Sequence, residues 1–257
     1  MKALRYAVRL VRLLLVVGLG VLLAGMVTAL ALLGFGRQPV LRQRLTRWFH
    51  VRLVGALPFR VSVHGSLPTA PMLWVGNHVS WTDIPLLGQL TPLAFLAKAE
   101  VRRWPLAGWL AEQGGTLFIR RGDAGQVAGQ LAERLRSPAS LMLFPEGTSS
   151  DGTGVRTFHG RLLSAAIDTG TAIQPVAIRY RRAGRPDPIA PFIGDDDLLS
   201  HLRRLLRSDS AEVEIFLLPP LDSHARSRNE LARAAQAAVE QALFGETQSL
   251  VTASQAA

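Results

Sequence analysis

The most prominent pattern along the chain is a long uncharged run of hydrophobic residues near its N-terminus. From Leu13 to Gly36 no residue is charged, and most of these 24 positions are Leu, Val, Ala or Gly. A helix of that length extends about 36 Å, enough to cross a hydrocarbon core of about 30 Å. Arginines stand on both sides, so the helix either crosses the bilayer once or lies in it with both ends on the cytoplasmic side. Ala29-Leu30-Ala31 resembles a signal-peptide cleavage site, but the run is too long for a typical h-region.

Residues 38–57 continue with hydrophobic positions at roughly helical spacing. Leu45, Trp48 and Phe49 recur among the arginines of this segment. An aromatic pair surrounded by arginines is suited to the headgroup region of a bilayer. The segment therefore predicts either an interfacial helix or a helix docked on the globular part of the protein.

Beyond Leu57-Pro58 the pattern changes to short hydrophobic runs that alternate with amphipathic stretches. The runs predict strands at 59–64, 72–75, 93–97, 116–119, 140–144, 172–179 and 212–217, and the stretches predict helices at 84–90, 123–136, 160–169, 198–207 and 229–243. Strands separated by such helices indicate an α/β fold, a largely parallel sheet with flanking helices. We expect three parts: membrane-anchoring helices at 1–57, an α/β domain at 58–245 and a polar, disordered tail at 246–257.

The composition excludes several kinds of site and indicates the kind of partner. The chain has no Cys, which excludes disulfides, thiolate metal sites and cysteine nucleophiles. Its net charge of +10 favours an anionic partner, either nucleic acid or an anionic lipid surface. Because the arginines gather around the hydrophobic run, membrane lipids are the expected partner and nucleic acid is not. The run Asp195-Asp196-Asp197 has no nearby His and is typical of a solvated turn, so no metal site is predicted.

The segment Gly76-Asn77-His78-Val79-Ser80-Trp81-Thr82-Asp83 follows a hydrophobic strand and is the first candidate for chemistry. His78 and Asp83 are five residues apart, which is not a same-face spacing on a helix. A turn ahead of the next helix would let the Asp83 carboxylate reach the far nitrogen of the His78 ring, fixing its tautomer and stabilising the imidazolium. His78 is thus a candidate general base, although a lone His is more often structural.

Three later segments also fall where predicted strands end, the edge at which open α/β sheets usually bind ligands. Gly114–Arg121 ends in Arg120 and Arg121, a possible anion site. Leu143–Gly152 contains Glu146 in a turn whose amides could face a ligand. Ile173–Ile178 is a hydrophobic strand interrupted by Pro175, which suits either a wall of a substrate cleft or a plain edge strand.

Taken together, the order and spacing of these four segments resemble the four sequence blocks of the glycerolipid acyltransferase family. The matching patterns are Asn-His-x4-Asp, Phe-Ile-x-Arg, Phe-Pro-Glu-Gly-Thr and the Pro-containing strand, over about Met72–Ile178. Bacterial 1-acylglycerol-3-phosphate acyltransferases and their relatives are the most similar branch. The resemblance implies a membrane-bound O-acyltransferase of the bacterial inner membrane with its active site on the cytoplasmic side.

The resemblance also implies roles for individual residues. His78 would be the general base on the acceptor hydroxyl, oriented by Asp83, and the alkoxide would attack the thioester of acyl-CoA or acyl-ACP directly. No cofactor is implied beyond this acyl donor. The residues implied to bind substrate are Asn77, Arg120, Arg121, Glu146, Gly147, Thr148 and Pro175.

Two departures from the family pattern concern the acceptor. The family commonly has Arg after Pro-Glu-Gly-Thr and a Lys-Gly pair a few residues later, whereas this chain has Ser149 and Phe158-His159-Gly160. The segments Glu-Gly-Thr-Ser-Ser-Asp-Gly at 146–152 and His-Val-Ser-Trp at 78–81 are similar to those of lyso-ornithine lipid acyltransferases, whose zwitterionic acceptor carries no phosphate. We expect lysophosphatidate as the acceptor, with lyso-ornithine lipid as the alternative. An acyl ester or thioester hydrolase is a further alternative, although no Gly-x-Ser-x-Gly elbow is present.

Overall fold

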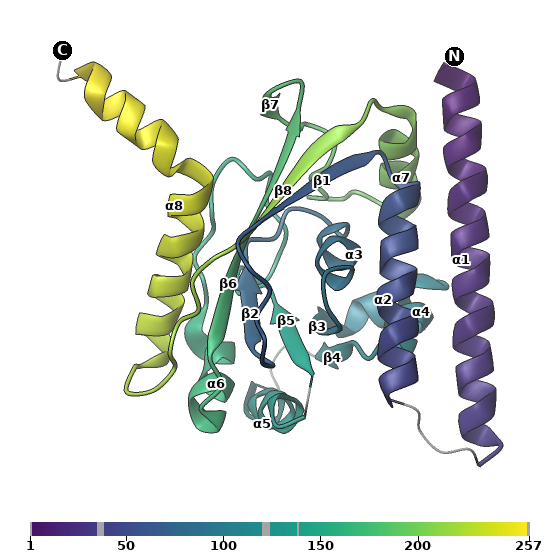
Figure 1. Ribbon diagram of the computed structural model, residues 1–257, viewed down its shortest axis with the longest axis horizontal. Helices are drawn as coiled ribbons and strands as arrows, with labels where there is room; N and C mark the ends of the chain where they lie inside the picture. The colour runs from purple at the N-terminus through teal and green to yellow at the C-terminus, as the bar shows by residue number, and fades with distance from the viewer. Residues whose placement is uncertain (1, 35–38, 120–123, 138, 256–257) are drawn as a thin grey trace.

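The computed structural model describes residues 2–34, 39–119, 124–137 and 139–255. Its centre is a sheet in the order β1-β8-β6-β2-β5-β3-β4, with the short strand β7 paired to β6 (Figure 1). The strands are β1 (Phe59–His64), β2 (Leu73–Gly76), β3 (Leu93–Lys98), β4 (Leu117–Ile119), β5 (Ser140–Leu143), β6 (Ile173–Arg182), β7 (Arg185–Pro186) and β8 (Ala211–Leu217). All neighbouring pairs are parallel except β6 with β8 and β6 with β7. The predicted α/β fold with a largely parallel sheet is confirmed.

The central strands are hydrophobic on both faces, and helices cover both faces of the sheet. The helices are α1 (Lys2–Leu32), α2 (Pro39–Ala56), α3 (Asp83–Gly88), α4 (Ala107–Gln113), α5 (Ala124–Leu135), α6 (Ser164–Thr169), α7 (Leu198–Arg207) and α8 (Arg228–Gln255), with 3₁₀ turns η1 (Ala99–Arg103) and η2 (Gly160–Leu163). Alternate residues of β2 point to opposite faces: Leu73 and Val75 pack with α5, α6 and α8, whereas Trp74 packs with α2 and α3.

Some elements differ from the expected ones. The predicted helix at 160–169 is divided into η2 and α6, and η1 and α4 were not predicted. Pro105, Gly108 and Gly114 interrupt that region, so no hydrophobic period long enough for a helix can be recognised there. Helix α8 runs to Gln255, whereas the composition at 246–257 predicted a disordered tail.

The N-terminal helix α1 lies beside α2 and against the α/β domain (Figure 1). Gly20 allows this close approach, because a Cβ at that position would stand 2.5 Å from the ring of Phe49 in α2. Leu13 is 5% exposed and packs in a cluster with Leu206 of α7. The side chain of Arg9 donates to the carbonyls of Leu206 and Ser208 at 3.0 and 2.6 Å, where α7 ends. The domain therefore holds α1 along much of its length.

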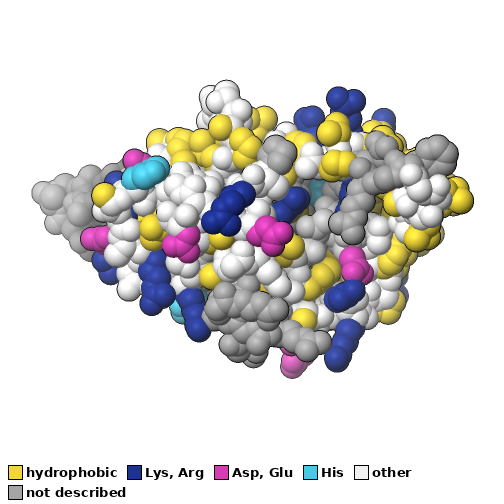
Figure 2. Space-filling view, turned by 90° about the horizontal axis from the view of Figure 1, so that it is seen from below, with side chains coloured by type: hydrophobic (Ala, Val, Ile, Leu, Met, Phe, Trp, Pro, Cys, Tyr) yellow, Lys and Arg dark blue, Asp and Glu magenta, His cyan; other side chains and the backbone are white. Residues whose placement is uncertain are grey.

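The outward side of α1 is hydrophobic. Its large exposed side chains are Leu4, Val8, Val11, Leu14, Leu15, Leu19, Leu22, Met26 and Leu32. Figure 2 shows hydrophobic side chains gathered at the end of the molecule where α1 lies. Among the described helices, α1 has the length and hydropathy to cross a membrane, and little of it is buried within the protein. Because exposed hydrophobic surface of this extent is costly in water, it marks the region where lipid would cover the protein.

Candidate active site

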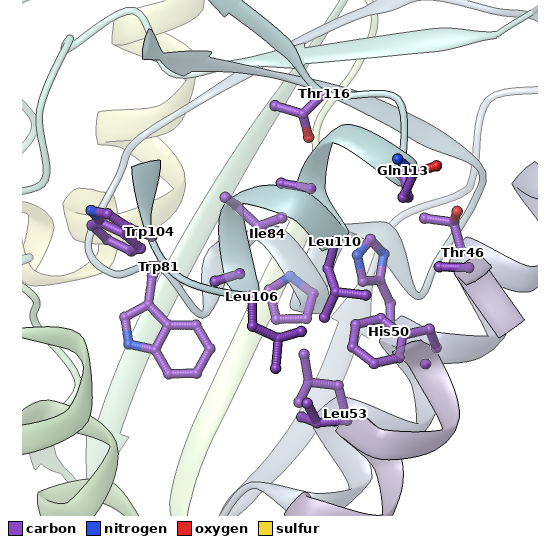
Figure 3. Close-up of a pocket in the computed structure, with 18 of the residues that line it drawn as sticks. Thr46, His50, Leu53, Trp81, Ile84, Trp104, Leu106, Leu110, Gln113 and Thr116 are labelled. Atoms are coloured by element: carbon purple, nitrogen blue, oxygen red, sulfur yellow. The ribbon is translucent and has the colours of Figure 1, made fainter. Parts of the chain in front are cut away.

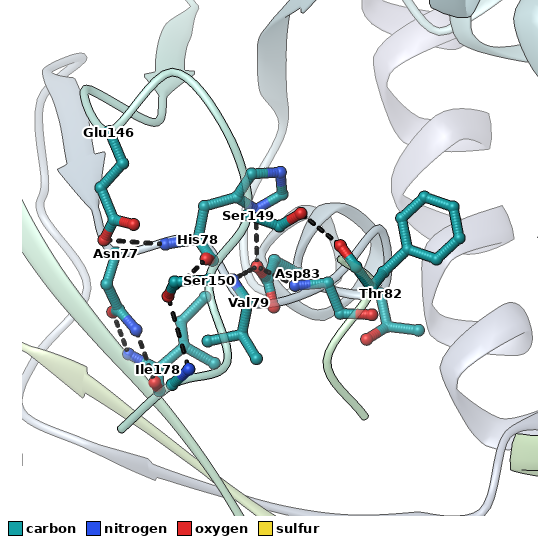
Figure 4. A network of polar contacts seen from close by, with 12 residues as sticks. Asn77, His78, Val79, Thr82, Asp83, Glu146, Ser149, Ser150 and Ile178 are labelled. Atoms are coloured by element: carbon teal, nitrogen blue, oxygen red, sulfur yellow. Dashed lines mark hydrogen bonds and ion pairs between the residues drawn. The ribbon is translucent and has the colours of Figure 1, made fainter. Parts of the chain in front are cut away.

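His78 and Asp83 come together in the turn between β2 and α3. The His78 Nδ1 lies 2.8 Å from the Asp83 Oδ2, and that oxygen also accepts hydrogen bonds from the backbone N–H groups of Val79 and Ser80 (Figure 4). Asp83 is completely buried, whereas a fifth of the His78 side chain is exposed. Because a carboxylate only accepts, Nδ1 carries the proton and Nε2 is free to accept one. The predicted relay geometry is present.

The turn explains how a five-residue spacing brings the two side chains together. Asp83 is the first residue of α3, and its N–H donates to the carbonyl of Ser80 at 3.0 Å. The carboxylate therefore folds back over the turn and accepts from the two amides inside it, an arrangement typical of Asp at turns and helix starts. The backbone thus places the carboxylate before any substrate binds, so little reorganisation is needed to orient His78.

The third predicted segment packs directly on the first. The ring of Phe144 stacks on that of His78 with 4.0 Å between centroids and 14° between planes. The backbone N–H and the side chain of Ser150 both donate to the carbonyl of His78, at 2.8 and 3.2 Å. His78 is therefore fixed by stacking and through its backbone as well as through Asp83.

Glu146 lies between these two segments and is 5% exposed. Its Oε1 accepts from the backbone N–H of His78 at 3.4 Å, whereas Oε2 has no hydrogen-bond partner among the described residues. Burial raises the pKa of Glu146 to about 7; the charge of Asp83 adds to this effect, and the N–H groups of His78 and Arg156 and the charge of Arg156 oppose it. A buried carboxyl oxygen without a partner, next to a candidate base, is suited to contact a bound polar group.

The other predicted binding residues differ in their surroundings. Gly147 has φ +71° and, like Thr148, is exposed on the turn after Glu146. The amide of Asn77 is buried and exchanges two hydrogen bonds with the backbone of Ile178 in β6, at 2.9 and 2.8 Å. These bonds hold the end of β2 on β6 and favour a positioning role for Asn77 over the expected substrate contact.

Two further predictions remain open. Pro175 is buried in β6 opposite Val75 and is not among the described residues that line the hydrophobic cavity below. Its expected place in a donor cleft therefore stays a prediction. Arg120 and Arg121 lie outside the described residues.

A hydrophobic cavity of about 410 Å³ lies between the α/β domain and the two N-terminal helices. Figure 3 shows Trp81 and Ile84, which follow His78 in the chain, together with residues of α2 and α4 such as Leu53 and Leu110. Trp81 is held in place by its Nε1, which donates to Nδ1 of the buried His201 at 3.0 Å. Through Trp81 and Ile84 the cavity adjoins the turn between β2 and α3 that carries His78.

Sequence reasoning missed this cavity and one polar neighbour of Asp83. The cavity lining comes from α1, α2, α3, β3, η1, α4 and α7, and no local pattern reports such an assembly. Tyr180, at the end of β6, donates from its hydroxyl to Asp83 Oδ1 at 2.5 Å. It comes directly after the hydrophobic run predicted as a strand at 172–179 and belongs to no motif, so no sequence pattern indicates its contact with Asp83.

Two residues of the acidic run 195–197 make structural contacts. Asp197 accepts from the N–H groups of Leu199 and Ser200 at the start of α7, and Asp196 pairs with Arg204 at 2.8 Å. Within the described parts of the chain, no group of three or more His, Asp and Glu residues is arranged to hold a metal ion.

Comparison with known proteins identifies the family. The family model described as Acyltransferase matches residues 60–179. A lyso-ornithine lipid O-acyltransferase from Pseudomonas aeruginosa is 59% identical over 95% of this chain and 96% of its own length. A 1-acyl-sn-glycerol-3-phosphate acyltransferase from Neisseria meningitidis is 33% identical over 52% of this chain and 56% of its own length.

The fold has a solved counterpart. The crystal structure of the 1-acyl-sn-glycerophosphate acyltransferase PlsC from Thermotoga maritima superposes with a TM-score of 0.63, covering 93% of this chain and 98% of that one at 23% identity. The identity to the Pseudomonas protein over nearly the full length of both chains decides the family. This chain therefore belongs to the acyltransferase family and is an O-acyltransferase of the lysolipid-acylating group.

Proposed function

We propose that the protein esterifies the free hydroxyl of lyso-ornithine lipid. The observation that carries this proposal is the 59% identity over nearly the whole chain to a protein with that name. Lysophosphatidate, the acceptor expected first from the motifs, is the weaker choice because the relatives named for it match less of the chain at lower identity.

The turn after Glu146 supports the same acceptor. Ser149 stands where the family commonly has Arg, and its hydroxyl donates to the carbonyl of Phe192. Phe192 in turn donates its N–H to the carbonyl of Val79 at 2.9 Å, so Ser149 belongs to a contact that closes this side of the turn. A side chain tied to a carbonyl offers no charge to a phosphate, whereas a zwitterionic headgroup does not need that cation.

The reaction follows from the free nitrogen of His78. Nε2 takes the proton from the acceptor hydroxyl, and the alkoxide oxygen attacks the carbonyl carbon of the acyl thioester. The buried Asp83 carboxylate, 2.8 Å from Nδ1, stabilises the imidazolium formed in this step. When the tetrahedral intermediate collapses, the C–S bond breaks, the new ester bond remains, and the imidazolium returns its proton to the leaving thiolate of CoA or acyl carrier protein.

The cavity beside Trp81 is proposed to hold the fatty acyl chain. Its lining is mainly Leu, Val, Ala and aromatic side chains, the surroundings that an alkyl chain prefers. Because part of the lining comes from α1 and α2, these helices would belong to the substrate site and not only to the anchor.

We further propose that α1 lies within one side of the bilayer and does not cross it. A helix that the domain contacts from Arg9 to Thr28, where Thr28 donates to the Gln113 side chain at 3.0 Å, cannot leave the domain without losing these contacts. Its exposed hydrophobic side chains would then rest in lipid, with the arginines at the headgroups. The cytoplasmic side of the bacterial inner membrane is the proposed location, since acyl-CoA and acyl-ACP are found there.

Acyl transfer by the detergent-purified protein tests the proposal. Labelled acyl-ACP and acyl-CoA are each offered with lyso-ornithine lipid or with lysophosphatidate, and His78→Ala serves as the inactive control. We expect efficient transfer to lyso-ornithine lipid and a loss of about 10²- to 10⁴-fold in the variant. Preference for lysophosphatidate would overturn the acceptor assignment, and release of free fatty acid with no transfer to either acceptor would favour the hydrolase alternative.

A further inference from the structure

The two oxygens of the Asp83 carboxylate have different partners. Oδ2 faces the turn and receives the His78 ring and two backbone amides. Oδ1 points the other way, towards β6, where the Tyr180 hydroxyl donates to it at 2.5 Å. Because a hydrogen bond to an ionised group is shorter and stronger than one between neutral groups, this contact fixes the carboxylate from the side opposite to His78.

A second hydroxyl extends this arrangement. Thr82 Oγ1 lies 2.8 Å from the Tyr180 oxygen. Since the Tyr180 proton is given to Asp83, the Thr82 hydroxyl is the donor in this pair. Both side chains are buried, and the Tyr180 ring packs edge-on against Phe59 at 5.8 Å between centroids. Thr82, Tyr180 and Asp83 thus form a chain of hydroxyl donors that ends at the carboxylate.

We propose that Tyr180, supported by Thr82, is a positioning residue for acyl transfer: it sets the orientation of the Asp83 carboxylate and so of the His78 ring. This inference rests on the proposed role of His78 as general base. Burial, together with the charge of Asp83, raises the pKa of Tyr180 well above its usual value, so the phenol stays protonated and remains a donor. Tyr180 acts on the substrate only through Asp83 and His78.

The hydrogen bond from the Tyr180 hydroxyl also affects how strongly Asp83 stabilises a positive charge on His78. A carboxylate that shares its charge with a phenol is a weaker partner for imidazolium than one without that bond. Among the described residues, the ionisable groups near Asp83 are Glu146 from the turn after β5, with Arg156 beside it, and Tyr180 from β6, with Asp187 of the loop after β7 beside it. Removing the phenol hydroxyl alone should therefore stabilise the imidazolium and move the acid limb of the pH–rate profile to higher pH.

The test is Tyr180→Phe, which keeps the ring against Phe59 and removes only the hydroxyl. Tyr6→Phe, at the other tyrosine of the chain, is the matched control, because Tyr6 lies on α1 beneath Arg207 and away from Asp83. Thr82→Val is a second variant, which leaves the Tyr180–Asp83 bond but removes its support. Purified proteins are compared in kcat, in KM for the lysolipid and in the pH dependence of kcat/KM, with thermal unfolding as a check on folding.

For Tyr180→Phe we expect kcat to fall about 10- to 100-fold, the range for one hydrogen bond to a charged group, with KM changed less than about twofold. The acid limb should move upward by about half a pH unit or more. Thr82→Val should lower kcat by a smaller factor, and Tyr6→Phe should match the wild type.

The outcomes separate this inference from the proposed function. Unchanged kcat and an unchanged acid limb in Tyr180→Phe, while His78→Ala is inactive, would overturn the positioning role alone. Full activity of His78→Ala would overturn the proposed mechanism itself. If Tyr180→Phe fails to fold, the kcat and acid limb of Thr82→Val decide, and wild-type values for both would overturn the inference.

Discussion

Glu146 is expected to lower the stability of the folded protein at neutral and alkaline pH, and replacing it with Gln isolates that effect. The carboxyl is buried beside His78 with one oxygen unpartnered. Its pKa is raised from 4.5 to about 7, and each unit of such a difference corresponds to about 1.4 kcal/mol. Ionised Glu146 therefore reduces the free energy of unfolding by at most about 3.5 kcal/mol, and by less where water reaches the turn.

The sign follows from which state binds the proton more tightly. The folded protein keeps the proton on Glu146 up to about pH 7, whereas the unfolded chain loses it near pH 4.5. The contribution of Glu146 to the free energy of unfolding is thus most favourable below about pH 4.5. It declines as the pH rises to 7 and is constant above that. Glu146→Gln, which has nearly the same shape and no charge, should be more stable than the wild type at pH 8 by about 1–3 kcal/mol and about equal to it at pH 5.

Thermal unfolding followed by tryptophan fluorescence in detergent, at pH 5 and pH 8, measures the difference. For a chain of this size about 1 kcal/mol corresponds to about 2–4 °C, so a rise in Tm of up to about 10 °C is expected at pH 8 only. Glu133→Gln, at an exposed position of α5, is the control and should change little at either pH. Equal Tm values for Glu146→Gln and wild type at pH 8, or a gain of the same size at pH 5, would refute the reasoning.

Three further predictions concern the cavity proposed to hold the acyl chain, the proposed acceptor site and the turn between β2 and α3. Gly20→Leu would collide with Phe49 at the cavity and should shift donor preference towards shorter acyl chains, measured with a series of acyl-CoA lengths; Gly18→Leu, which meets open space, should keep the wild-type profile. Ser149→Arg breaks the contact with Phe192 and adds a cation, so the kcat/KM ratio of lysophosphatidate to lyso-ornithine lipid should rise about tenfold. Asn77→Ala removes two buried hydrogen bonds and should lower the free energy of unfolding by about 2–4 kcal/mol in denaturant titrations.

Local pattern was sufficient for most of the fold. The strand β2 could be recognised because it is a short continuous hydrophobic run, and the helix α7 because its hydrophobic residues recur at helical spacing. The region around α4 could not be recognised, since Pro105 and Gly108 break the pattern and packing against α1 compensates for weak intrinsic preference. The choice between a crossing and an in-plane α1 depends on contacts with α7 and α4, which a hydropathy pattern does not contain.

Some contacts of the candidate site could also be expected from local sequence, whereas others depend on the order of the strands. The proximity of His78, Asp83 and Glu146 could be expected because each lies in a turn directly after a predicted strand of one sheet, and the structure brings the three together. Tyr180 reaches Asp83 from 97 residues away, through the pairing of β6 with β2, and only the sheet order brings them together. The hydrogen bonds of Asn77 could not be foreseen for a similar reason: in sequence it is adjacent to His78, but in space its amide is bonded to the backbone of Ile178 in β6.

The docking of α1 along the domain, with α1 in one face of the bilayer as proposed above, would have a kinetic consequence. An enzyme that lies in one face of a bilayer meets its lipid acceptor by lateral diffusion, so its rate depends on the mole fraction of acceptor in the surface and not on the amount per volume of solution. Diluting the acceptor with inert phospholipid would then slow turnover at constant bulk concentration. The soluble acyl donor would reach the site by diffusion in solution, and the acceptor by diffusion in the membrane plane. The rate would therefore respond separately to the supply of thioester and to the composition of the surrounding membrane.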